Sequence, residues 1–367
     1  LLVSNHTGLG GCFYACSGSL VHRARHAQTT SGSNTNRTLS LLQKTARSCR
    51  GGCHGFNVSR TRTNELDQKP VKKSNNLTSI HLEEVAGWAD YHLLDSGEGK
   101  TLEKIGPYLL IRPEAQAIWQ KSKPELWKQA HAMRIEESKE YGGHWNFLKP
   151  MDKTWQIAYK DLRCQLKVAT SRHVGIFPEQ AVHWDWMTTR VKKARKPFKM
   201  LNLFGYTGLA TLAAASAGAE VTHVDSSKHA LSWASYNLKL SGLADHPVRW
   251  IADDALKFAQ REARRGNKYQ GLVLDPPKFG RGADGQVWDF FKKMPELIDA
   301  CRQILADDAD FIVLTAYAIS ASAVITAQAV EAIAGARGSI ETGELVMRDE
   351  SAGHMLSHAL YSRWKAD

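Results

Sequence analysis

The chain has 367 residues, of which 43% are hydrophobic, and a formal net charge of +11 at pH 7. This length allows one large or two modest folded domains, and no apolar run is long enough to span a bilayer, so we expect a soluble protein without a membrane partner. The charge is uneven, because residues 1–64 hold eight Lys or Arg and no Asp or Glu, which leaves only +3 for the rest of the chain. Net charge therefore gives little support to a nucleic-acid partner for the folded part.

The first 64 residues are rich in Arg and Ser and show no hydrophobic periodicity. We expect residues 1–80 to form a disordered tail, and its composition resembles an organelle transit peptide. A transit peptide would direct the protein to a mitochondrion or plastid; an untargeted tail or a mistranslated upstream region would leave it cytoplasmic. Four of the six cysteines form two Cys-x-x-x-Cys pairs in this tail. Their spacing is allowed in zinc sites, but no strand or helix pattern surrounds them, so we expect no metal site.

A small β-rich subdomain is expected over residues 88–173, where short alternating segments are separated by turn residues. Its polar stretch 134–150 predicts no element. The predicted strands are Tyr91–Leu94, Lys104–Ile105, Tyr108–Arg112, Thr154–Tyr159 and Arg163–Thr170, and a short helix is predicted over Glu125–Met133.

Residues 174–367 predict an α/β domain that begins with a strand, a turn, a helix and a second strand. Met200–Phe204 is a short apolar run typical of a buried parallel strand, and Gly205–Gly208 leads from it into a helix of small residues, Ala210–Ala217. The second strand, Glu220–Val224, ends at Asp225. Its carboxylate is expected at the carboxyl edge of the sheet, where an acid can hold ribose hydroxyls. This unit predicts a nucleoside site, although an ordinary strand, turn and helix without a ligand is the alternative.

The turn argues against a dinucleotide. NAD sites use Gly-x-Gly-x-x-Gly so that the backbone can approach a pyrophosphate, whereas this turn has only Gly205 and Gly208. An NAD oxidoreductase is therefore disfavoured.

A second motif, Asp-Pro-Pro-Lys-Phe at 275–279, follows the predicted strand Tyr269–Leu274. The two prolines stop the strand and fix the backbone, so that the preceding carboxylate can face a planar, amine-bearing group while the aromatic ring stacks on a base. The alternative is a turn that only leaves the strand. The residues predicted to bind the substrate or act in catalysis are Asp275, Pro276, Pro277, Lys278 and Phe279.

The rest of the chain alternates helices and strands. The predicted helices are Lys228–Leu240, Ala255–Arg264, Pro295–Leu305 and Ser320–Ala334, and the predicted strands are Val248–Ile251, Asp310–Leu314, Ile340–Val346 and Ala359–Ser362. The loop 280–286 is rich in glycine and predicted to be mobile.

Together these motifs resemble class I S-adenosylmethionine (SAM)-dependent methyltransferases, a family similar to the bacterial 23S rRNA methyltransferases that act on cytosine C5 or guanine. The resemblance rests on GIFPEQ at 175–180, NLFGYTG at 202–208, VDSSKHAL at 224–231, DDALKF at 253–258 and DPPKF at 275–279. It implies a Rossmann-like sheet of seven mostly parallel strands, SAM as cofactor and RNA, in particular rRNA, as substrate. The SAM contacts that it implies are Phe177, Gln180, Asn202, Phe204, Gly205, Tyr206, Gly208, Asp225 and Asp254. Asp254 can instead cap the following helix.

The resemblance leaves the acceptor atom open, and the cysteines help to choose it. Carbon 5 of a pyrimidine becomes nucleophilic only after a thiolate adds at carbon 6, so C5 methylation needs a cysteine beside the acceptor. C5-methylating relatives are expected to place it after the fifth strand, where this chain has Thr315–Ala318, and only Cys164 and Cys301 remain outside the tail. We therefore expect a nitrogen acceptor, with Asp275 as hydrogen-bond acceptor, although Lys278 departs from the Asp-Pro-Pro-aromatic pattern of amino methyltransferases. The alternatives are the same chemistry on a small molecule or protein, and a non-catalytic RNA-binding factor with a vestigial SAM pocket.

Overall fold

The computed structural model describes residues 79–136, 142–169, 172–195, 197–281, 285 and 287–367. All of them belong to one compact unit, Pro70–Asp367. The structure does not describe residues 1–78. It therefore does not test the predicted tail, its cysteines or the cellular location that the tail implies. No helix in the described ranges is long and apolar enough to cross a membrane.

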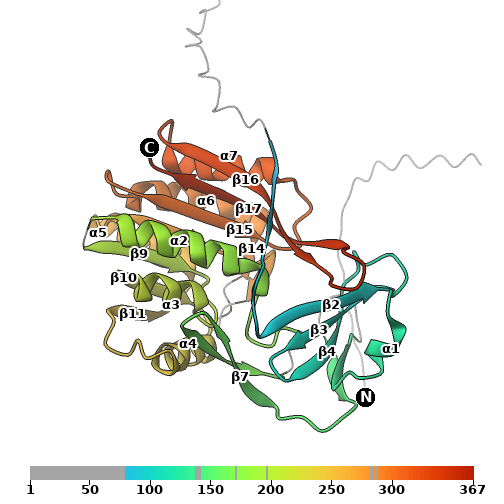
Figure 1. Ribbon diagram of the computed structural model, residues 1–367. Coiled ribbons are helices and arrows are strands. Elements are labelled where there is room, and N and C mark those ends of the chain that lie inside the picture. Colours follow the sequence, from blue (N-terminus) through green and yellow to red (C-terminus); the bar gives the residue numbers. More distant parts are fainter. Residues whose placement is uncertain (1–78, 137–141, 170–171, 196, 282–284, 286) are drawn as a thin grey trace, which may run out of the picture. The chain divides into compact units, whose positions relative to one another are not determined.

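An eight-stranded sheet forms the centre of this unit (Figure 1). Its strand order is β1-β16-β17-β15-β12-β9-β10-β11, and neighbours run parallel except that β17 is antiparallel to both β15 and β16. The strands are β1 (His81–Glu84), β9 (Phe198–Leu203), β10 (Ala219–Asp225), β11 (Val248–Ala252), β12 (Gly271–Leu274), β15 (Phe311–Ala316), β16 (Ser339–Arg348) and β17 (Met355–Lys365).

The predicted class I fold is confirmed, but the number of strands is not. From β16 to β11 the seven strands have the expected order, with β17 antiparallel. β1 adds an eighth strand at the edge beside β16. Its sequence, HLEE, is mostly exposed and has no apolar face, which is why its pattern predicted no strand.

Helices cover both faces of the sheet, and the strand residues alternate between them. Met200 and Val273 pack in a core with α2 and α3, whereas Leu201 and Leu272 pack with α5, α6 and α7. Successive side chains of a strand point to opposite faces, so this alternation gives each helical layer its own core. The helices are α2 (Ala181–Lys193), α3 (Leu209–Ser216), α4 (Lys228–Leu240), α5 (Ala255–Arg265), α6 (Phe290–Ile304) and α7 (Ala323–Ala334).

The β-rich part contains a five-stranded sheet and a separate hairpin. The five strands are β2 (Tyr91–Gly97), β3 (Lys100–Ile105), β4 (Tyr108–Pro113), β5 (Ala132–Ile135) and β6 (His144–Phe147), and the hairpin consists of β7 (Thr154–Tyr159) and β8 (Leu162–Lys167). The domain boundaries at 88–173 and 174–367 stay predictions.

Two predicted helices have different bounds, and one predicted loop contains strands. The helix predicted over Glu125–Met133 is wrong beyond its first turn: α1 covers Pro124–Trp127, and Met133 lies in β5, paired with β4 and β6. Strand pairing outweighs local propensity there. α6 begins at Phe290, five residues before the predicted Pro295, because Asp289 caps it by accepting a hydrogen bond from the Lys292 N–H. The first two residues of the loop predicted over 280–286 belong to β13 (Phe279–Arg281), which pairs with β14 (Val287–Asp289) directly after the loop.

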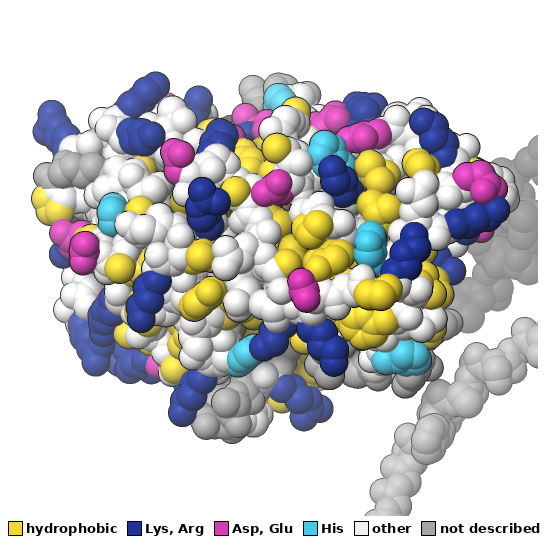
Figure 2. All heavy atoms as spheres, turned by 60° about the horizontal axis from the view of Figure 1, so that its bottom comes forward, with side chains coloured by type: hydrophobic (Ala, Val, Ile, Leu, Met, Phe, Trp, Pro, Cys, Tyr) yellow, Lys and Arg dark blue, Asp and Glu magenta, His cyan; other side chains and the backbone are white. Residues whose placement is uncertain are grey.

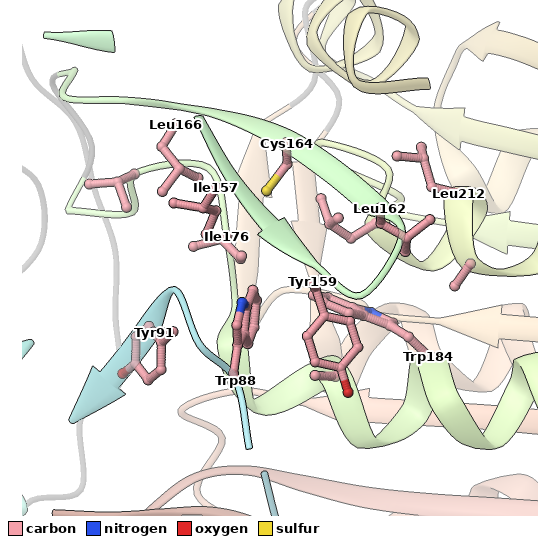
Figure 3. Close-up of a cluster of buried hydrophobic side chains, with 14 of the residues drawn as sticks. Trp88, Tyr91, Ile157, Tyr159, Leu162, Cys164, Leu166, Ile176, Trp184 and Leu212 are labelled. Carbon is pink, nitrogen blue, oxygen red and sulfur yellow. The ribbon is translucent and has the colours of Figure 1, made fainter. Parts of the chain in front are cut away.

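Aromatic side chains join the β7–β8 hairpin to helix α2 (Figure 3). Trp88 contacts Tyr159 with ring centroids 4.7 Å apart and Trp184 at 6.0 Å, and Tyr159 contacts Trp184 at 5.5 Å. Trp184 lies on α2, and the same core includes Leu212 of α3. The hairpin is thus fixed to the two helices that lie beside the start of the site described below.

Leu166 tests the importance of this core. Its side chain is 0% exposed on β8, so Leu166→Ala removes contacts that cannot be replaced by water and should lower the free energy of unfolding by about 2–5 kcal/mol. Leu82→Ala on β1, where the side chain is 55% exposed, is the control and should change it by less than about 1 kcal/mol. Urea unfolding measures both, and equal effects would contradict the packing described here.

Candidate active site

The site begins at a strained turn after β9. Phe204 and Tyr206 have φ angles of 61° and 49°, which are uncommon for residues other than glycine. The Asp225 carboxylate holds this backbone, because Oδ2 accepts a hydrogen bond of 2.9 Å from the Tyr206 N–H and Oδ1 accepts one of 2.8 Å from the Ser227 N–H. Asp225 therefore stabilises the turn in addition to lying at the edge of the sheet, as predicted. Burial raises the pKa of this carboxyl above its ordinary value.

The two glycines of the turn lie where no side chain fits. A Cβ atom on Gly205 would lie 2.3 Å from the ring of His223, and one on Gly208 would lie 2.8 Å from the Cβ of Ala234. Gly208 also has a φ angle of 88°. These positions need glycine because side chains of β10 and α4 fill the space where a Cβ would lie, and both glycines also line a small pocket at the start of α3.

A buried polar network supports the turn from below. Asn202 Nδ2 donates to Thr211 Oγ1 at 3.0 Å, and this hydroxyl hydrogen-bonds His223 Nδ1 at 2.9 Å. Burial lowers the pKa of His223 to about 3, so the ring is neutral near pH 7. Asn202 was predicted to contact SAM, and the structure places its side-chain amide in this network, with the residue in the wall of a small pocket below the turn.

The segment 175–180 crosses the turn and reaches two further strand ends. The Gly175 carbonyl accepts a hydrogen bond of 2.8 Å from Thr207 Oγ1. The Phe177 ring lies 5.8 Å from the Tyr206 ring and 5.2 Å from the Tyr317 ring. The segment thus connects the turn after β9 with the residues that follow β15.

Gln180 links this segment to the second predicted motif. Its Nε2 donates to the Tyr317 hydroxyl at 3.0 Å and to Asp275 Oδ2 at 3.4 Å. Gln180 was predicted to contact SAM, and its cofactor role stays a prediction, but its amide faces the acceptor motif.

Asp275 is a half-buried residue whose carboxyl group has one buried, unsatisfied oxygen. It follows β12, and its N–H donates to the Leu203 carbonyl at 3.3 Å. Within the described ranges Oδ1 is buried without a hydrogen-bond partner. Burial, and to a lesser extent the nearby Glu179 carboxylate, raise the pKa of Asp275 to about 8. A buried acceptor without a partner is costly to fold, so it is expected where a ligand supplies the donor.

The prolines and the aromatic residue of the motif have different environments. Pro276 is buried, and the Pro277 carbonyl accepts a hydrogen bond of 2.6 Å from Trp288 Nε1. Lys278 is exposed, and the Phe279 side chain is 39% exposed. The prolines therefore fix the backbone, and Phe279 presents a ring to solvent.

One cavity of about 710 Å³ brings the two motifs together. Asp225 and Asp275 both line it, and its size is within the range of small-molecule sites. The predicted site residues in its wall are Phe177, Phe204, Tyr206, Asp225, Asp275, Pro277, Lys278 and Phe279. A smaller pocket of about 50 Å³ shares four of these residues and adds Gln180, Asn202, Gly205 and Gly208.

Two predicted residues do not line these spaces, and several unpredicted ones do. Asp254 caps α5, accepting a hydrogen bond of 2.9 Å from the Lys257 N–H, and its contact with adenine stays a prediction. Pro276 is buried behind the cavity wall. Among the unpredicted residues, Tyr317 follows β15, so its position at a strand end could have indicated it. Arg172 and His173 also line the cavity. They do not directly follow a strand, so no sequence signal identifies them.

The fold and the cavity define a nucleoside-binding α/β protein of the class I methyltransferase type. Residues 98–361 match the family model of the S-adenosylmethionine-dependent methyltransferases, and the chain belongs to this family. The family's cofactor is SAM. A solved SAM-dependent methyltransferase from Agrobacterium tumefaciens is 44% identical, with a TM-score of 0.75 over 78% of this chain and 94% of that one.

Relatives of known substrate match over shorter stretches. Ribosomal RNA large subunit methyltransferase I of Klebsiella pneumoniae is 38% identical over 105 residues, which is 28% of this chain and 24% of that protein. Ribosomal RNA large subunit methyltransferase K/L of Pseudomonas aeruginosa is 30% identical over 156 residues, or 42% of this chain and 20% of that protein. The chain thus spans about a quarter or less of these two relatives.

The residues present fit SAM. Gly205 and Gly208 line the small pocket beside α3, and the Asp225 carboxylate lies where ribose hydroxyls are held in such folds. No group of three or more His, Cys, Asp or Glu that could hold a metal ion occurs within the described ranges.

Gly205→Ala tests the steric limit at the turn. The added methyl group collides with the His223 ring, so the turn must shift, and we expect the affinity for S-adenosylhomocysteine (SAH) to fall roughly tenfold or more. Replacing the ring as well, in Gly205→Ala with His223→Ala, should restore part of the affinity, with His223→Ala alone as the control. Calorimetric titration measures all three, and unchanged binding by Gly205→Ala would contradict the close approach.

Asp275→Asn tests the unsatisfied carboxyl group. A raised pKa means that the unfolded chain ionises before the folded one, so this carboxyl destabilises the protein increasingly as the pH rises from about 4 to about 8. The variant without cofactor should therefore gain melting temperature over the wild type, more at pH 8.5 than at pH 5. Asp253→Asn, which removes the ion pair with Arg261, should show no such gain. A lower melting temperature for Asp275→Asn at both pH values would contradict the burial of an unpaired carboxyl.

Proposed function

We propose that the chain transfers the methyl group of SAM to a nitrogen atom of a base in ribosomal RNA. The observation that carries this proposal is the buried, unsatisfied Oδ1 of Asp275. Asp275 and Asp225 line the same cavity. An oxygen without a partner can accept a hydrogen bond from an N–H of the acceptor base. The cavity joins it to the turn where SAM is expected.

Three observations support a base of RNA as the acceptor. The exposed Phe279 ring lies beside Asp275 in the cavity wall, where it can stack on a base. The relatives that match in sequence are named as ribosomal RNA large subunit methyltransferases. The face in Figure 2 carries many Lys and Arg side chains among apolar patches and scattered Asp and Glu, and the cations are compatible with a polyanion.

The cysteines favour nitrogen over carbon 5. Cys164 on β8 is 1% exposed and Cys301 on α6 is 0% exposed, and burial raises the pKa of each thiol to about 12. Neither is among the described residues that line the cavity. The position after β15 is taken by Tyr317, so no described thiolate is available to add to a pyrimidine.

The side chains around the cavity suggest how transfer is assisted. Bound SAM supplies an electrophilic methyl group on a sulfonium sulfur. In its ionised form, Asp275 accepts a hydrogen bond from the acceptor N–H and thereby orients the nitrogen. As the methyl–nitrogen bond forms and SAH leaves, the carboxylate can take the proton that nitrogen loses, and its raised pKa of about 8 favours holding it. Phe279 and the fixed prolines hold the base in place, so that alignment and exclusion of water provide most of the rate.

Asp275→Ala gives the direct test. With purified rRNA that lacks the modification and labelled SAM, we expect label in RNA to fall at least about 100-fold, because the acceptor is no longer oriented. The affinity for SAH should stay within a few fold, since Asp225 and the turn are intact. Asp253→Asn is the control and should retain most of the transfer.

The same assay separates the alternatives. Label that enters protein or small molecules but not RNA would replace the proposed substrate, and absence of SAM binding would favour a non-catalytic RNA-binding factor. Full turnover by Asp275→Ala would remove its proposed role.

A further inference from the structure

The β13–β14 hairpin has two different faces. In the antiparallel register Gly280 pairs with Trp288, while Phe279 pairs with Asp289 and Arg281 pairs with Val287. Trp288 is buried: its ring lies 4.8 Å from the Phe204 ring, and its Nε1 donates to the Pro277 carbonyl. Because side chains alternate along a strand, the other face is turned away from this contact.

That second face carries exposed apolar side chains. Phe279 is 39% exposed, Val287 is 46% exposed and Phe291, in the first turn of α6, is 47% exposed. Phe279 and Val287 lie on the same face of the hairpin, and Phe291 follows the end of β14 by two residues, so this short stretch presents three exposed apolar side chains. The patch starts at the cavity, since Phe279 lines it.

Positive charge accompanies these side chains. The Arg281 guanidinium lies over the Phe279 ring, 5.9 Å from its centre. Lys278 precedes Phe279 and is exposed, and it lines the cavity. Lys292 follows Phe291 and forms an ion pair of 3.6 Å with Asp289. Among the described residues of this segment, the cations Lys278, Arg281 and Lys292 outnumber the one carboxylate, Asp289.

We infer that this hairpin surface, defined by Phe279, Arg281, Val287 and Phe291, binds the nucleotides next to the target base in single-stranded RNA. This inference rests on the proposed function and adds the place where the rest of the substrate is held. Exposed rings with adjacent cations are the features that bind single strands, because bases stack on the rings and phosphates pair with the cations. A duplex keeps its bases stacked inside and cannot use the rings.

The inward face explains how this binding reaches the reaction centre. Trp288 contacts both Phe204 in the turn and the Pro277 carbonyl in the acceptor motif. RNA bound to the outward face is therefore held by the same short hairpin that contacts the turn after β9 and the Asp275 motif.

Two variants outside the reaction centre test the inference in the full chain. The probe is a fluorescently labelled pool of random single-stranded RNA decamers, with saturating SAH, and anisotropy gives the affinity. Phe291→Ala should weaken binding roughly 5- to 100-fold, because one stacking surface is lost. Arg281→Gln should weaken binding and reduce the slope of log affinity against log salt by about one, because one phosphate contact is lost.

Matched controls lie on other surfaces. Tyr236→Ala removes a 44% exposed ring on α4, and Arg302→Gln removes a cation that pairs with Asp299 near the end of α6. Both should bind the decamers like the wild type. All variants should bind SAH within about twofold of the wild type, which shows that they are folded.

The outcomes separate this inference from the proposed function. Wild-type affinity in both Phe291→Ala and Arg281→Gln, or equal affinity of the wild type for single strands and duplexes, would overturn the hairpin surface, while methylation of rRNA by the wild type would leave the proposed function standing. Absence of label in RNA with the wild type would instead overturn the proposed function.

Discussion

The site depends on the hydrogen bonds that the Asp225 carboxylate accepts from two backbone N–H groups. Its two oxygens accept hydrogen bonds from the N–H groups of Tyr206 and Ser227, and so it fixes the turn after β9 to the end of β10. Without this support, the left-handed backbone at Phe204 and Tyr206 would relax toward ordinary angles. This turn also positions the segment 175–180, because the Thr207 hydroxyl donates a hydrogen bond to the Gly175 carbonyl. The turn after β9 and the Asp275 motif are therefore connected through the segment 175–180.

This arrangement includes strained backbone and an unsatisfied carboxyl oxygen, and packing in the two cores offsets their cost. The positive φ angles of the turn and the unpaired oxygen of Asp275 each oppose folding. The cores on both faces of the sheet, with the Trp88, Tyr159 and Trp184 contacts, supply the compensating stability. Such a division is expected of a protein whose site is prepared to receive a ligand.

The parts of the fold that depend on local pattern could be predicted from the sequence. β9, α3 and β10 follow from an apolar run, two glycines and a terminal acid, and both Asp225 and Asp275 lie at strand ends as expected. Features that depend on distant partners could not. β1 exists because it pairs with β16, and β5 because it pairs with β4 and β6, although neither has a strong pattern of its own. In the same way, the amide of Gln180 faces Asp275 and Tyr317 because three strand ends meet there, which no single motif reveals.

The central claim is that Asp275 presents a base nitrogen to the methyl donor. Mass spectrometric mapping of nucleosides in ribosomal RNA, from cells with and without this protein, tests it most directly. The account predicts one methylated base that is lost with the protein and carries its methyl group on nitrogen. A lost 5-methylcytosine, or an unchanged set of modified nucleosides, would contradict it.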